Sequence, residues 1–129
     1  MKKVTLDTNI IISAALSPNG KAEKILQLIF DGKVMLYYCE EILFEYENVL
    51  LRPKFNFAIE KQKLFIDGIK HCGILIEPIR STILFSDESD RIFYDTAKEC
   101  NAILITGNIK HYPTESFIMT PSEYLGNWR

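Results

Sequence analysis

Acidic side chains border the apolar segments of this chain at three widely separated points. Asp7 comes directly after a short apolar run, Glu45 lies within an amphipathic segment, and Asp90 precedes another. Carboxylates gathered in one cleft repel each other and remain ionised only when a cation compensates them. Oxygen ligands without a cluster of cysteines or histidines suit Mg²⁺ or Mn²⁺ rather than zinc. Such ions activate water and hold the oxygens of a phosphodiester during in-line displacement.

Further polar residues could complete such a site, as ligands or as groups that contact ligands or substrate. These are Asp87, Asn108, Thr8, Asn9, Thr106 and His111. The oxygens of Asp87 and Asn108 are potential metal ligands. The threonine hydroxyls could bond a carboxylate or a phosphate oxygen, and His111, next to an aromatic residue, could stack on a base.

Each of these acids also has an ordinary structural explanation. Asp7 could cap the helix that follows it, and Asp90 could be a cap or first-turn acid favoured by the helix dipole. Asp87 could be a turn residue, and Glu45 a solvated acid on a helix surface. Helical geometry places Glu45 at the border of the apolar face of its segment, which favours a position at the edge of the core.

Hydrophobic periodicity predicts strands that alternate with helices. The predicted strands are residues 4–6, 34–38, 74–76, 102–105 and 117–119. The predicted helices are residues 21–30, 40–51, 57–72 and 91–100, followed by a short terminal helix after the capping box at Thr120. Within residues 91–100, Asp95 stands one turn after Arg91, a spacing typical of an exposed ion pair.

This alternation predicts an α/β fold with a mainly parallel central sheet and with helices on both of its faces. The chain of 129 residues has the length of one domain, without a linker or a repeat. Ligands of such sheets bind beyond the carboxyl ends of the strands. Asp7 and Asn108 follow two predicted strands, so we expect both at that edge.

Composition excludes a disordered or low-complexity chain and does not indicate a nucleic-acid binder. Apolar residues make up 47%, and 15 basic residues stand against 17 acidic ones, a net charge of −2. Without Asp7, Glu45 and Asp90, 14 acidic residues remain. The net charge therefore describes the metal-free chain. The basic residues that could meet phosphates are scattered: Lys21, Lys24, Arg52, Lys54, Arg91 and Lys110.

The three cysteines, Cys39, Cys72 and Cys100, are odd in number and lack metal-site spacing, which argues against a disulfide framework or a zinc knuckle. The apolar run at the start is too short for a signal peptide, and no apolar run is long enough to span a bilayer. We therefore expect a soluble, cytoplasmic protein with reduced thiols.

Four segments, in this order, resemble the motifs of the PIN-domain family, in particular its toxin components of toxin–antitoxin systems (VapC-like ribonucleases). The segments are Leu6-Asp7-Thr8-Asn9-Ile10, Cys39-Glu40-Glu41-Ile42-Leu43-Phe44-Glu45-Tyr46, Asp87-Glu88-Ser89-Asp90 with Ala97, and Ile105-Thr106-Gly107-Asn108 with His111-Tyr112-Pro113. A lone Asp-Thr-Asn is a weak signal, whereas four motifs in order across nearly the whole chain are a strong one.

The resemblance implies a three-layer α/β/α fold and an endoribonuclease that depends on Mg²⁺ or Mn²⁺. It implies that Asp7, Glu45 and Asp90 form the acidic core of the site. Many relatives carry an aspartate where this chain has Asn108, and a neutral amide is a weaker ligand for a hard cation. Whether the site holds one or two metal ions therefore remains open, and Asp87 could supply the missing charge. Relatives commonly form homodimers and are inhibited by an antitoxin protein.

Two other functions remain as alternatives. A phosphatase of the haloacid dehalogenase type also starts with an aspartate after the first strand, but it requires a second acid where this chain has Asn9. A PIN-like domain that binds RNA or a protein without cleaving RNA is compatible with Asn108. Binding of Mg²⁺ or Mn²⁺ distinguishes the enzyme from such a degenerate domain.

Overall fold

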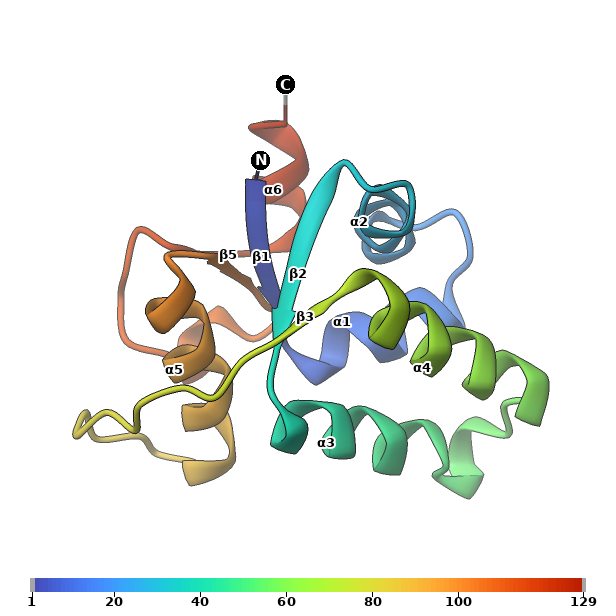
Figure 1. The fold of residues 1–129 in the computed structure, drawn as a ribbon, viewed down its shortest axis with the longest axis horizontal. Coiled ribbons are helices and arrows are strands. Elements are labelled where there is room, and N and C mark those ends of the chain that lie inside the picture. Colours follow the sequence, from blue (N-terminus) through green and yellow to red (C-terminus); the bar gives the residue numbers. More distant parts are fainter. Residues whose placement is uncertain (1, 129) are drawn as a thin grey trace.

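The computed structural model describes residues 2–128 and shows a sheet of five parallel strands (Figure 1). The strand order is β3-β2-β1-β4-β5, and every neighbouring pair is parallel. The strands are β1 (Lys2–Leu6), β2 (Val34–Tyr38), β3 (Ile74–Leu75), β4 (Ile103–Ile105) and β5 (Ile118–Met119). The mainly parallel α/β fold predicted from the sequence is therefore confirmed.

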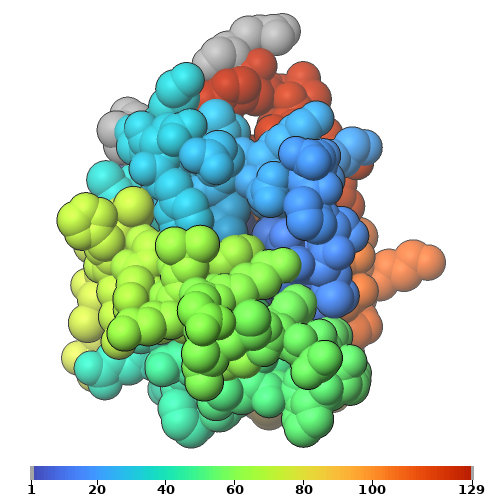
Figure 2. Space-filling model, turned by 90° about the vertical axis from the view of Figure 1, so that its right-hand side faces the viewer, coloured from blue at the N-terminus to red at the C-terminus, as the bar shows by residue number. Residues whose placement is uncertain are grey.

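Helices cover both faces of this sheet, as a three-layer α/β/α fold requires. They are α1 (Thr8–Leu16), α2 (Lys21–Phe30), α3 (Glu40–Leu50), α4 (Ile59–Cys72), α5 (Arg91–Cys100) and α6 (Pro121–Gly126). The helix α5 packs against β1, β2 and β4 on one face, and α2 and α4 contact β2 from the other. Figure 2 shows the outer surface of the second layer, where α2 lies above α4.

The central strand β1 determines where the polar residues after it lie. Val4, Thr5 and Leu6 are all fully buried, which is the burial expected for a strand covered on both faces. Leu6 is in register with Ile105 of β4, and the backbone N–H of Asp7 donates to the Ile105 carbonyl at 3.0 Å. The pairing of β1 with β4 thus brings Asp7 beside Thr106 at the carboxyl edge.

The predicted helices agree with the structure to within a residue or two at their ends. The second helix closes at Gly32, which adopts a φ of 77° that glycine tolerates without strain. The terminal helix α6 begins with the predicted capping box between Thr120 and Glu123. The helix α4 begins at Ile59 rather than at Phe57, because Phe57 stacks on Phe55 in the preceding turn at 5.6 Å between ring centroids.

The predicted exposed ion pair between Arg91 and Asp95 is wrong. Both side chains are buried, and the guanidinium of Arg91 instead binds the carboxylate of Glu88 at 2.8 Å. It also donates to the carbonyl and hydroxyl oxygens of Ser81, at 2.8 and 2.9 Å, and to the carbonyl of Ile83. Arg91 therefore attaches the segment between β3 and α5 to the body of the fold.

Two further features concern the cysteines and the helices. All three cysteines are free thiols, and only Cys39 is fully buried. Within residues 2–128, no helix is long and apolar enough to cross a membrane.

We expect Arg91→Met to lower the free energy of unfolding by roughly 2–3 kcal/mol, because several partly buried acceptors lose a charged donor at once. Arg80→Met is the matched control. Arg80 also pairs with Glu88, at 3.2 Å, but both side chains are exposed, so the expected loss is about 0–1 kcal/mol. Urea unfolding of both variants measures the difference, and equal losses would contradict this role of Arg91.

Candidate active site

A cleft of about 470 Å³ lies at the carboxyl edge of the sheet, beside the ends of β1 and β4. After β1 the chain adds β2 and β3 on one side of the sheet and then β4 and β5 on the other. Ligands of open parallel sheets bind at such a switch point. The polar residues in its wall come from four distant parts of the chain. They include Asp7, Thr8, Asn9, Glu45, Asp90 and Asn108, together with Ser13, Ser17 and Arg52. The three acids and the asparagine that the sequence singles out thus line one cleft.

Asp7 is the most buried acid of the cleft, with 7% of its surface exposed. Its Oδ2 accepts hydrogen bonds from the hydroxyls of Thr106, at 2.8 Å, and Tyr112, at 2.9 Å. Neither bond involves Oδ1. The two donors therefore orient the carboxylate and leave one oxygen free of hydrogen bonds from residues 2–128.

Glu45 reaches the cleft from α3, at the border of that helix's buried face. The hydroxyl of Thr8 donates to its Oε2. Burial raises the pKa of Glu45 above its ordinary value, the Thr8 hydrogen bond lowers it, and the negative charge of Asp7 raises it again. The Thr8 hydroxyl thus fixes one oxygen of Glu45 within the acidic cleft.

Asp90 enters the cleft from the turn before α5 and has an unusual carboxyl group. Its Oδ2 is buried without a hydrogen-bond partner among residues 2–128, and Nδ1 of His111 lies 3.8 Å away. Burial raises the pKa of Asp90 to about 6, and the charges of Asp7 and Asp87 contribute in the same direction. A buried carboxylate oxygen without a donor is unfavourable unless a cation compensates it.

The loop after β4 is held by hydrogen bonds between the first and fourth motifs. The side-chain oxygen of Asn9 accepts from the Gly107 N–H at 3.0 Å, and the Asn108 N–H donates to the Thr106 hydroxyl at 3.0 Å. Asn9 therefore has a structural role at the position where a haloacid dehalogenase-type phosphatase would need its second acid. Asn108 lines the cleft beyond this loop.

Asp87 and His111 lie at the margin of this group. Asp87 is exposed, and its Oδ1 accepts from the backbone N–H and the hydroxyl of Ser89, at 2.9 and 2.7 Å. These bonds lower the pKa of Asp87. It does not line the cleft, although its charge reaches Glu45 and Asp90. The imidazole of His111 is more than half exposed beside Asp90.

The side chains of this cleft fit a hard divalent cation. Within residues 2–128, no three carboxylate, imidazole or thiol groups converge closely enough to form a ready-made ion site. The orphaned Oδ2 of Asp90 and the free Oδ1 of Asp7 are hard oxygen donors, and Asn108 adds an amide oxygen.

Sequence reasoning missed the structural role of Tyr112, which it considered only as a neighbour of His111. Tyr112 is buried, and desolvation together with the charge of Asp7 raises its pKa well above the ordinary value, so it remains a donor. Its ring meets Phe85 edge to face, at 6.2 Å between centroids. The sequence feature that could have indicated this role is that Tyr112 is the single tyrosine among the fourth-motif residues.

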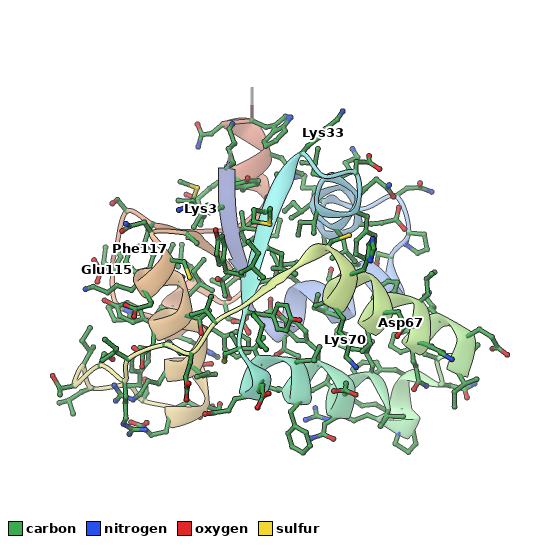
Figure 3. The ribbon with its side chains drawn as sticks, in the orientation of Figure 1. Lys3, Lys33, Asp67, Lys70, Glu115 and Phe117 are labelled. Carbon is green, nitrogen blue, oxygen red and sulfur yellow. The ribbon has the colours of Figure 1, made fainter. Side chains whose placement is uncertain are left out.

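Aromatic and acidic contacts hold the segment after Tyr112 against α5. Tyr94 of α5 donates to the carboxylate of Glu115, and its ring packs on Phe117 at 5.4 Å between centroids. Figure 3 shows Glu115 and Phe117 beside α5. These contacts fix the return of the chain from the site to β5, so Tyr112 is held between two anchored segments.

We expect Asp90→Asn to stabilise the metal-free protein at neutral pH. The folded protein holds the Asp90 proton more tightly than an unfolded chain does, so the ionised group lowers stability above pH 6, and this penalty vanishes as the pH falls below about 4. Partial exposure reduces the effect, and we expect a gain of about 1–2 kcal/mol at pH 7.5 in EDTA.

Asp87→Asn is the matched control for Asp90→Asn, because the pKa of Asp87 is lowered rather than raised. That variant should lose stability at pH 7.5 and change least in acid. Urea unfolding of both variants at pH 7.5 and 4 tests the two signs. Destabilisation by Asp90→Asn at pH 7.5 in EDTA would contradict the electrostatic strain inferred for the cleft.

Comparison with known proteins shows the family of this chain. A model of the PIN domain matches residues 3–110. The chain is 35% identical over 109 residues to the uncharacterized protein MJ1680 of Methanocaldococcus jannaschii, covering 82% of this chain and 70% of that protein.

The fold is similar to that in the crystal structure of VapBC2 from Rickettsia felis bound to a DNA fragment from its promoter. The TM-score is 0.58 at 18% identity, over 84% of this chain and 89% of the other. The family model and the archaeal relative together show that this chain belongs to the PIN-domain family.

Proposed function

We propose that this protein is an endoribonuclease that depends on Mg²⁺ or Mn²⁺ and hydrolyses RNA phosphodiester bonds. The observation that carries the proposal is the location of Asp7, Glu45 and Asp90 in the wall of one cleft, with a buried Asp90 oxygen that lacks a partner among residues 2–128. Such an arrangement is costly in the metal-free state, which is expected of a site organised to bind a cation. Membership of the PIN-domain family supports the same chemistry.

The residues of the cleft would have two roles, which are to bind the ion and to orient a water molecule. Asp7 and Asp90 would hold the ion, with Asn108 as an auxiliary oxygen. When bound, a divalent cation would offset the acidic charge and lower the pKa of a water molecule. Glu45, held at one oxygen by Thr8, accepts a hydrogen bond from the attacking water and orients it towards phosphorus. In-line attack leaves a 5′-phosphate and a 3′-hydroxyl.

The RNA backbone would approach along the wall of the cleft that α3 and α1 provide. Arg52, just after α3, lines this wall and offers a guanidinium to a phosphate. Phe55 lies in the same wall and presents an aromatic surface on which a base could stack. His111 lies near Asp90 and could stack on a base. These contacts do not distinguish one RNA sequence from another.

A toxin role within a toxin–antitoxin pair is the biological setting that we propose for this activity. The resemblance of the four motifs to VapC-like toxins supports it, as does the fold shared with the VapBC2 structure. An antitoxin would then be a protein partner, and a homodimer is a further expectation from relatives. Growth arrest on expression, relieved by Asp7→Asn, is the cellular test of the toxin role.

We expect Asp7→Asn to reduce cleavage of a labelled single-stranded RNA by at least about a hundredfold, because the site loses a charge that holds the ion. Cleavage by the wild type should require Mg²⁺ or Mn²⁺ and stop in EDTA. Glu60→Gln, an exposed acid at the start of α4, is the control that should retain activity. Undiminished cleavage in EDTA, or by Asp7→Asn, would refute the proposed mechanism.

We expect Tyr112→Phe to weaken Mn²⁺ binding by about tenfold, because Asp7 loses one of the two donors that orient it. Tyr124→Phe is the matched control, since the Tyr124 hydroxyl is buried in α6 without a partner among residues 2–128. Calorimetric titration of the two variants measures the difference without an activity assay. Equal affinity in both would show that the phenol of Tyr112 does not position Asp7.

A degenerate domain that binds RNA without cleaving it is the alternative that Asn108 favours. An amide in place of a fourth acid leaves the cleft with three carboxylates, two of which already accept hydrogen bonds from the protein. Calorimetry with Mg²⁺ and Mn²⁺ separates the two functions. Absence of saturable binding by the wild type would favour the binding domain over the enzyme.

A further inference from the structure

A second and larger cleft, of about 560 Å³, lies on the other side of α5 and shares no residue with the first. Its walls are the start of α3, the start of α5 with its first turns, and the segment 75–80 at the end of β3. Figure 1 shows the chain crossing from β3 towards α5 in this region. A volume of this size is typical of small-molecule sites.

The charge of this second cleft is strongly negative. Five acids and two arginines line it, a formal charge of −3 against −2 for the whole chain. Both arginines are bound to the same acid, Glu88. Within residues 2–128, the carboxylates of Glu40, Glu41 and Glu77 form neither an ion pair nor a hydrogen bond. An anionic ligand is therefore excluded on electrostatic grounds.

Asp95 supplies the observation that goes beyond a surface cluster of acids. It lines the inner wall of the cleft and is 4% exposed. Its Oδ2 accepts from the Ser81 N–H at 3.0 Å, but its Oδ1 is buried without a partner among residues 2–128. The guanidinium of Arg91 interacts electrostatically with the Asp95 carboxylate, yet its N–H groups donate hydrogen bonds to Ser81, Ile83 and Glu88 instead. The Asp95 carboxylate is thus incompletely satisfied.

The remaining wall of the cleft is apolar. Leu75, Ile76, Pro78 and Ile92 line the cleft together with the buried carboxylate and the exposed glutamates. A divalent metal ion suits this lining poorly, because hard cations take oxygen ligands and four apolar side chains form part of the wall. An alkyl chain with a cationic group at each end fits it better, since methylenes would contact the apolar wall while the ends meet carboxylates.

We propose that this second cleft binds a linear aliphatic diamine or polyamine. One ammonium group meets Asp95, the methylene chain lies along Leu75, Pro78 and Ile92, and the other ammonium faces the glutamates at the rim. The ligand class is recognised by two positive charges joined by an alkyl chain, whereas a monoamine has one charge. This site is separate from the nuclease cleft, so its occupancy does not depend on the proposed function.

Calorimetric titration with 1,4-diaminobutane and spermidine, at fixed ionic strength, tests the proposal. The wild type should bind one equivalent, and butylamine should bind roughly tenfold or more weakly, because it cannot make the second charged contact. Asp95→Asn keeps an acceptor for the Ser81 N–H and should weaken binding by about tenfold or more. Asp7→Asn should leave amine binding unchanged, which excludes the nuclease cleft as the site.

Substitutions of exposed glutamates provide a second test if Asp95→Asn does not fold. Glu77→Gln combined with Glu41→Gln removes charge at the rim and should weaken spermidine binding about fivefold, whereas Glu60→Gln on α4 should not. Equal binding of butylamine and diaminobutane, equal loss in the Glu60 control, or loss in Asp7→Asn would each overturn the proposal. So would the absence of saturable binding by the wild type.

Discussion

The hydrogen bond between the Asp7 N–H and the Ile105 carbonyl is the constraint on which the site depends. It extends the pairing of β1 with β4 by one residue and places two motifs nearly a hundred residues apart side by side. The Thr106 hydroxyl can then reach Asp7, and the Thr106 oxygen can accept from the next loop. A shift of one residue in this register would turn Asp7 to the opposite face of the sheet.

Gathering the acids costs free energy that other parts of the fold must offset. Tyr46 illustrates how, because it is fully buried under the site and donates to the Leu6 carbonyl at the end of β1. Its phenol stays protonated, since burial and the charge of Asp7 raise its pKa well above the ordinary value. The ring also stacks near Phe93 of α5, at 6.5 Å between centroids. Apolar burial thus holds α3, β1 and α5 together beneath carboxylates that repel each other.

The parts of the site that follow from strand ends and helix periodicity could be predicted from the sequence. Asp7 and Asn108 come after strands, and the spacing of apolar residues places Glu45 at the border of α3. The Tyr112 hydrogen bond could not be predicted, because it requires the loop after β4 to fold back under Asp7. The Arg91–Asp95 prediction failed since a spacing of four residues reports helix geometry, whereas tertiary packing decides which neighbour each side chain meets.

The net charge of −2 conceals an uneven distribution that bears on RNA binding. Lys3 and Lys33 lie at the amino end of the sheet (Figure 3), where Lys2 also contacts the Trp128 ring at 4.3 Å. The acids of both clefts lie near the opposite end. A polyanion approaching the carboxyl edge of the metal-free protein would therefore meet repulsion, with Arg52 as the cationic side chain in the wall of the first cleft. Substrate binding at this edge thus requires compensation of the acids first, which couples RNA affinity to the cation in the proposed enzyme.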